Sequence, residues 1–300
     1  MNSLSYSASG KLLLFGEYLV LKGSLSFSIP LSVGQNLHIL PYSGKGILWQ
    51  CFEFEKCWLE IYFSEKLEII YTTDIKKALP VQKLLLFIRE RKHNPGSSGL
   101  CFKFDLNFNR YYGFGTSATL ISLLSQWSGL DPYLLLAQSF DGSGYDIATA
   151  TAKQPILYSI AQKVTGSCSL PESVTQHLLF VYRGKKQISA SEVASFKNKQ
   201  IRSGQIEQMN AIIASASRCT HISAWEKLMQ ESEQLIAPIL GVPAVKEQQF
   251  ADYPYAIKSL GAWGGDFIMV AFRDLSEAKN YFMQKHTQSL YTYRELIKQR

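Results

Sequence analysis

A short glycine-rich segment at residues 113–118 constrains the fold and the chemistry of this chain more than any other feature. The segment reads Gly-Phe-Gly-Thr-Ser-Ala. Before it, residues 100–108 alternate in polarity, as a half-buried strand does. After it, apolar residues continue at helical spacing to Trp127 and stop at Ser128-Gly129. We therefore expect a strand, a tight glycine turn and a helix, in that order.

This arrangement suits a phosphate group. Glycine lets the backbone approach a ligand closely, and free N–H groups at a helix N-terminus attract negative charge. A serine in the first turn can place its hydroxyl on Mg²⁺. The segment predicts a phosphate-binding loop with Ser117 as the metal ligand. A plain strand-to-helix turn capped by Ser117 is the structural alternative.

Other phosphate-binding motifs fit the chain less well. The Walker A pattern G-x-x-x-x-G-K-[ST] is absent, as are the H-R-D and D-F-G motifs of protein kinases. Gly113, Gly115 and Ala118 match the Rossmann pattern G-x-G-x-x-A, but a Rossmann turn usually lies in the first strand–helix unit. Here a long β-rich region precedes it. A dinucleotide-binding protein stays open as an alternative.

Three further segments contain residues that could take part in catalysis or ligand binding. Residues 11–21 predict an apolar strand, a turn at Gly16 and a second strand. Lys11 precedes the apolar residues 12–15, and a half-buried ammonium needs an acidic partner unless it reaches water. Asp146 follows the glycine-rich turn 142–144, where it either caps a helix or pairs with Lys11. Residues 261–265 contain three glycines, which indicates close approach to a ligand or another loop, or a simple hairpin turn.

Taken together and in this order, the four segments resemble the motifs of the GHMP kinase superfamily. This superfamily includes galactokinase, homoserine kinase, mevalonate kinase and phosphomevalonate kinase. Residues 10–20 are similar to its GK-x-x-x-x-GEY-x-V motif, and residues 113–118 to its G-L-G-S-S-A loop. Residues 143–146 are similar to its S-G-x-D turn, and residues 261–265 to its G-A-G-G-G loop. The segments around residues 137–148 and 258–266 are most similar to phosphomevalonate kinases.

The resemblance implies an α+β, two-domain GHMP kinase fold. Residues 1–165 would form an N-terminal nucleotide-binding domain like the second domain of ribosomal protein S5, and residues 166–300 a ferredoxin-like C-terminal domain. It also implies transfer of the γ-phosphoryl group of ATP, with Mg²⁺, to a small anionic acceptor. Phosphomevalonate or mevalonate, from isoprenoid precursor synthesis, is the expected acceptor. Homoserine, a sugar, or ligand binding without turnover stay open.

The resemblance also implies roles for individual residues. Asp146 is the expected catalytic residue that accepts or orients the acceptor's proton, and Lys11 is expected to pair with it and keep it ionised. The expected ATP-binding residues are Gly113, Gly115, Thr116, Ser117 and Ala118. The expected substrate-binding residues are Glu17, Tyr18, Lys185, Ser189, Lys258, Gly264 and Gly265. Lys185 and Ser189 belong to a basic string, 183–189, that a solvated surface loop explains equally well.

The chain departs from the family pattern at several positions. Residues 109–112 lack the proline and the first glycine that usually begin the phosphate loop, and Thr116 replaces a serine. Trp263 stands where glycine is usual. Mevalonate kinases carry a metal-binding glutamate near the position of Leu135, where this chain has no acid. The resemblance therefore leaves the acceptor, retained activity and the carboxylate ligand of Mg²⁺ undetermined.

Composition narrows the remaining function classes. The chain has 300 residues and a net charge of +7, but its Lys and Arg residues are scattered, so we expect no nucleic-acid partner. A cationic cleft for a small anion explains the charge equally well. No apolar run approaches a membrane span. Five cysteines without a C-x-x-C pair fit a reducing cytoplasm, and five histidines show no ligand spacing. We expect a cytoplasmic monomer or homodimer.

Overall fold

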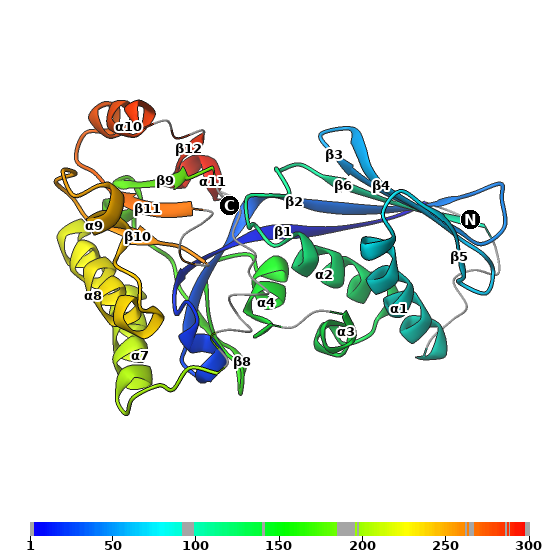
Figure 1. The fold of residues 1–300 in the computed structure, drawn as a ribbon, viewed down its shortest axis with the longest axis horizontal. Helices are drawn as coiled ribbons and strands as arrows, with labels where there is room; N and C mark the ends of the chain where they lie inside the picture. The colour runs from blue at the N-terminus through cyan, green and yellow to red at the C-terminus, as the bar shows by residue number, and fades with distance from the viewer. Residues whose placement is uncertain are drawn as a thin grey trace. The chain divides into compact units, whose positions relative to one another are not determined.

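The computed structural model describes residues 3–91, 99–139, 142–184, 196, 198–261, 263, 267–285, 287 and 289–297 (Figure 1). These residues form two compact units. Unit 1 comprises Met1–Gly10, Val33–Arg110 and Gly115–Thr151, and unit 2 comprises Lys11–Ser32, Tyr111–Phe114 and Ala152–Arg300. Neither unit is one continuous stretch of chain. The division into domains at residues 165 and 166 stays a prediction.

Unit 1 is a sheet with helices on one face. Its strands follow the order β5-β4-β3-β6-β2, and all neighbours are antiparallel except β3 and β6. The rings of Trp49 and Phe104 lie 4.4 Å apart in its core. The strands are β3 (Ile47–Glu53), β4 (Lys56–Phe63), β5 (Ile69–Thr72) and β6 (Leu100–Leu106), with parts of β1 (Leu4–Phe15) and β2 (Ser26–Pro41). β1 pairs with β2, and the residues of both strands between Lys11 and Ser32 belong to unit 2. The helices are α1 (Ile75–Arg91), α2 (Thr116–Ser128), α3 (Pro132–Ser139) and α4 (Tyr145–Thr151).

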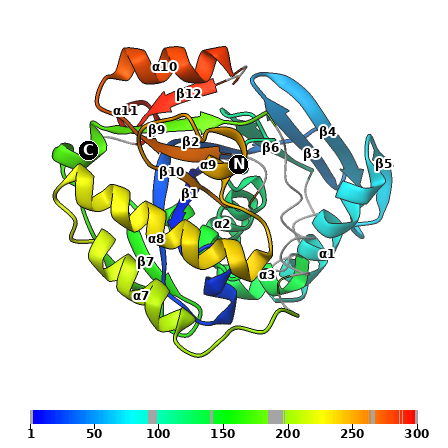
Figure 2. The same cartoon turned by 60° about the vertical axis from the view of Figure 1, so that its left-hand side comes forward.

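Unit 2 contains a four-stranded antiparallel sheet of order β10-β11-β9-β12. Along the chain, β9 (Leu178–Tyr182) is followed by α7 (Gln205–Ala216), α8 (Ile222–Leu240), β10 (Ile257–Ser259), β11 (Phe267–Ala271), α10 (Leu275–Gln284) and β12 (Ser289–Thr292). This is the ferredoxin-like arrangement. Figure 2 shows α8 running beside β10. The remaining elements are η1 (Leu19–Lys22), β7 (Ile156–Ser159), β8 (Lys163–Ser167), α5 (Glu172–Thr175), α9 (Val245–Gln249) and α11 (Tyr293–Leu296).

The predicted α+β architecture is confirmed, and most predicted elements lie where the pattern placed them. One local prediction is wrong. Residues 11–21 were expected to form strand, turn and strand, but the chain forms the short 3₁₀ helix η1 after Gly16. Leu19 and Val20 are both buried, whereas consecutive strand residues point to opposite faces. Among the described residues, no helix is long and apolar enough to cross a membrane.

Candidate functional site

The N-terminus of α2 has the features of an anion site. Its N-cap residue, Gly115, has φ 93° and ψ 40°, a left-handed conformation that favours glycine, and no side chain caps the helix. The first intrahelical bond runs from the Thr119 N–H to the Gly115 carbonyl at 2.9 Å. The N–H groups of the first turn, residues 116–118, therefore have no acceptor within the helix. The Ser117 side chain is exposed beside them.

Aromatic packing anchors the segment that leads to this loop. Tyr112 and Phe114, on either side of Gly113, contact rings of the four-stranded sheet. The Tyr112 ring lies 4.4 Å from that of Tyr182, and the Phe114 ring 4.9 Å from that of Phe267. The Lys11 N–H also donates to the Phe114 carbonyl at 2.9 Å. These contacts fix residues 112–114, which lead into the loop. They do so although residues 109–112 lack the proline and glycine that usually begin such a loop.

Asp146 lies in the first turn of α4, which packs against α2 within unit 1 (Figure 1). Its side chain is half-buried, and its Oδ1 accepts a hydrogen bond from the Ile147 N–H at 3.0 Å. Thus Ser117 and Asp146 are carried by neighbouring helices of the same unit. Lys11 is half-buried at the beginning of unit 2, and its pairing with Asp146 stays a prediction.

The residues that could hold Mg²⁺ are few. Across the described part of the chain, no group of three or more His, Cys, Asp or Glu side chains could bind a metal by itself. Leu135 is fully buried in the core of unit 1. Mg²⁺ usually keeps several waters and takes one or two protein oxygens together with substrate phosphates. The exposed hydroxyl of Ser117 fits one of the protein oxygens in that ligand set.

A buried ion pair joins two distant parts of unit 2. Lys258 Nζ lies 2.5 Å from Glu17 Oε1, and neither side chain is more than 1% exposed. Burial raises the pKa of Glu17, although the attraction and hydrogen bond of Lys258 lower it in part. The Lys258 ammonium also lies 5.1 Å from the centre of the Phe15 ring. In this structure Glu17 and Lys258 bind each other. Their role in substrate binding stays a prediction.

Tyr18 connects the same two parts of unit 2. Its hydroxyl accepts a hydrogen bond from the Trp263 N–H at 3.1 Å, and its ring lies 5.0 Å from that of Phe196. Tyr18 has φ 60°, which costs about 1–3 kcal/mol in a residue other than glycine. The Trp263 side chain is buried. The structure therefore brings the Gly16-Glu17-Tyr18 turn and the segment around Trp263 together.

The sequence did not reveal Glu233 on α8 as part of this cluster. Glu233 is 4% exposed, and its Oε1 accepts a hydrogen bond from the Ser259 N–H at 2.9 Å. Burial raises the pKa of Glu233 to about 7, although Lys258 lowers it in part. Burial lowers the pKa of Arg183, and the charge of Glu233 raises it in part. One signal existed: Glu233 lies on the apolar face of its helix, with Trp225, Met229, Ser232 and Ile236.

Several predicted residues are not located by the structure. Lys185 and Ser189, in the basic string after β9, lie outside the described residues. The same is true of Gly264 and Gly265, in the C-terminal glycine-rich loop. Their roles stay predictions.

Comparison with known proteins shows similarity of structure only. No family model and no curated protein matches the sequence. A Methanococcus jannaschii mevalonate kinase superposes with a TM-score of 0.70 at 16% identity, over 97% of each chain. A Streptococcus pneumoniae phosphomevalonate kinase, in complex with phosphomevalonate and AMPPNP, has a TM-score of 0.68 at 16% identity. That match covers 97% of this chain and 100% of the other.

A Lactococcus lactis galactokinase complexed with galactose is also similar. Its TM-score is 0.66 at 11% identity, over 97% of this chain and 93% of the other. All three proteins are kinases with different acceptors. The chain therefore has the fold of the GHMP kinases, as the resemblance implied.

Proposed function

We propose that this chain is an ATP- and Mg²⁺-dependent kinase that phosphorylates a small anionic acceptor, with phosphomevalonate or mevalonate as the first candidates. The observation that carries the proposal is the uncapped N-terminus of α2, which begins at a left-handed glycine and packs beside the helix that carries Asp146. A similar fold in a phosphomevalonate kinase crystallised with an ATP analogue supports it.

Phosphoryl transfer depends on positioning and charge neutralisation more than on covalent chemistry. In this proposal the N–H groups of residues 116–118 bind the phosphates of ATP, where the helix dipole favours negative charge. Ser117 would hold Mg²⁺, which when bound would supply positive charge against the phosphates.

Asp146 and Lys11 act on the acceptor. A hydroxyl acceptor such as that of mevalonate loses a proton during transfer, and Asp146 accepts or orients it. A phosphate acceptor is already ionised near neutral pH, so there Asp146 mainly orients Lys11. The Lys11 ammonium offsets the charge of the transferred group.

The acceptor side is proposed to include Glu17, Tyr18, Lys258 and the loop that contains Gly264 and Gly265. The buried ion pair and the Tyr18–Trp263 hydrogen bond support a role in fixing that loop. The basic string that contains Lys185 and Ser189 provides positive charge for an anionic acceptor. It begins at Arg183, directly after β9.

The test is an ADP-release assay over mevalonate, phosphomevalonate, homoserine and galactose. We expect turnover with one of the two mevalonate-pathway acids, and we expect Asp146→Asn to lower kcat at least 100-fold. The matched control is Asp131→Asn, an exposed acid at the start of α3 where asparagine caps equally well.

Three outcomes of this assay, of an ATP-binding measurement and of thermal unfolding would redirect the proposal. Turnover only with homoserine or galactose would assign another acceptor. ATP binding without ADP release for any acceptor would indicate a binding protein. Stabilisation against thermal unfolding by NAD(P) but not by ATP would favour the dinucleotide alternative.

A further inference from the structure

Ser259, the last residue of β10, has backbone groups that no strand of the four-stranded sheet pairs with. β10 is three residues long and lies at the edge of its sheet. In an antiparallel pair, alternate residues direct their N–H and C=O groups toward the neighbour. The Leu260 N–H donates to Phe267, and the Ala256 carbonyl accepts from Ala271, so these residues face β11. Ser259 therefore directs its backbone groups to the side that has no strand.

Ser259 is nevertheless only 3% exposed, so both of these backbone groups need partners. Two charged side chains supply them. Glu233 Oε1 accepts from the Ser259 N–H, and Lys258 Nζ donates to the Ser259 carbonyl, each at 2.9 Å. The Ser259 hydroxyl also donates to Glu233 Oε2 at 3.3 Å. Lys258 is fixed in turn by Glu17. These side chains take the place of a neighbouring strand.

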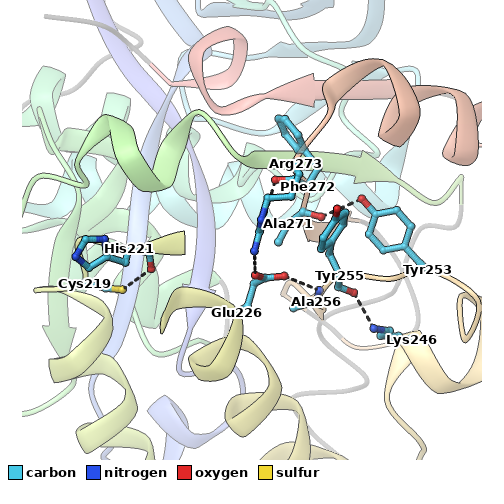
Figure 3. Close-up of polar contacts among 10 residues, drawn as sticks. All are labelled: Cys219, His221, Glu226, Lys246, Tyr253, Tyr255, Ala256, Ala271, Phe272 and Arg273. Atoms are coloured by element: carbon cyan, nitrogen blue, oxygen red, sulfur yellow. Dashed lines mark hydrogen bonds and ion pairs between the residues drawn. The ribbon is translucent and has the colours of Figure 1, made fainter. Parts of the chain in front are cut away.

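The same helix also holds the other end of β10. Glu226 lies seven residues before Glu233, two turns of helix, and so on the same face of α8. Its Oε1 accepts from the Ala256 N–H at 3.3 Å, and its Oε2 pairs with Arg273 (Figure 3). Helix α8 thus binds the strand at both ends through glutamates. Only the Glu233 end leads into the glycine-rich loop.

We propose that Glu233 is a positioning residue, which fixes the backbone at Ser259 and so the turn at Gly261, where the segment with the proposed acceptor-binding residues begins. Ser259 is followed by Leu260 and by Gly261, whose φ of 65° turns the chain. The next described hydrogen bond holds the Trp263 N–H on Tyr18. Without Glu233, the buried N–H of Ser259 loses its acceptor, and the chain that leads to Gly261 is no longer held to α8. The effect on kinetics rests on the proposed kinase function.

Variants at position 233 distinguish the effect of side-chain length from the effect of charge. Glu233→Gln keeps an oxygen at the same reach without charge, whereas Glu233→Asp keeps the charge on a shorter side chain. We expect Glu233→Ala and Glu233→Asp to raise the KM for the acceptor at least fivefold, with kcat changed less than threefold. Glu233→Gln should keep KM within twofold. The matched control is Glu226→Ala, which loses the equivalent bond far from the loop and should also keep KM within twofold.

Hydrogen exchange without any ligand gives a second measurement. In peptides that cover residues 257–263, we expect exchange at least tenfold faster in Glu233→Ala and Glu233→Asp than in the wild type, and unchanged exchange in Glu233→Gln. If Glu233→Ala does not fold, the Gln and Asp variants decide. Rescue by Asp but not by Gln, or unchanged exchange in all variants, would overturn the proposal. The expected exchange pattern in a protein without kinase activity would refute the proposed function and support the positioning role.

Discussion

Replacing Glu233 with glutamine should stabilise the protein above neutral pH. Burial raises the pKa of this carboxyl from 4.5 to about 7, even with Lys258 nearby. A carboxyl whose pKa is higher in the folded state binds its proton more tightly there. Its stabilising contribution is therefore complete below about pH 4.5 and is lost as the pH rises through about 7. Glutamine accepts the same hydrogen bond from Ser259 and carries no charge to lose.

The size of the effect follows from the shift. A rise of the pKa from 4.5 to about 7 corresponds to on the order of 3 kcal/mol of folding free energy once the group is ionised. The Glu233 side chain is buried, so solvent does little to screen its charge. We expect the free energies of unfolding of wild type and Glu233→Gln to agree within about 1 kcal/mol at pH 5 and to differ by about 3 kcal/mol at pH 8.

Urea unfolding followed by circular dichroism between pH 5 and pH 8 measures this difference directly. The control is Glu231→Gln, at an exposed residue two positions earlier on α8, which should keep the free energy of unfolding within about 0.5 kcal/mol of the wild type. A difference that does not change with pH, or a glutamine variant less stable than the wild type at pH 8, would show that ionisation of buried Glu233 does not destabilise the fold.

Three further predictions follow from other contacts. Lys258→Ala leaves the Glu17 carboxylate buried without its partner and should lower the free energy of unfolding in urea by about 3–5 kcal/mol. The double variant with Glu17→Gln should recover much of that lost stability. Gly115→Ala forces a side chain into a left-handed conformation and should cost about 1–2 kcal/mol in the same assay, with weaker ATP binding by calorimetry. Tyr112→Phe removes the hydrogen bond to Ser289, 2.8 Å in this structure, and should cost about 1 kcal/mol while the aromatic packing is kept; a loss above about 3 kcal/mol would contradict this.

Local signals made the elements around the loop predictable. The glycine turn, the apolar spacing and the Gly129 stop all lie within a few residues of α2, so the sequence alone predicts both of its ends. The N-terminal end of helix α1 was not predictable in this way. Its first turn, from Ile75, is largely exposed, so the apolar pattern begins only further along, near Val81.

The charged cluster of unit 2 was not predictable in the same way. Glu17 and Lys258 are separated by 241 residues, and only the folded chain brings them together. β10 is three residues long and contains Lys258 and Ser259, so it has no apolar alternation to indicate a strand. Glu233 was visible only as a charge on an apolar helix face, a pattern that gives no partner.

In the proposed function, the first turn of α2 binds the phosphates of ATP. The most direct test is a titration of isotope-labelled protein with a non-hydrolysable ATP analogue and Mg²⁺, in which the backbone amide signals are followed by nuclear magnetic resonance. We expect the largest chemical-shift changes at residues 115–118, and we expect that NAD⁺ does not produce them. Unshifted amides at these residues under saturating nucleotide would contradict the proposed function.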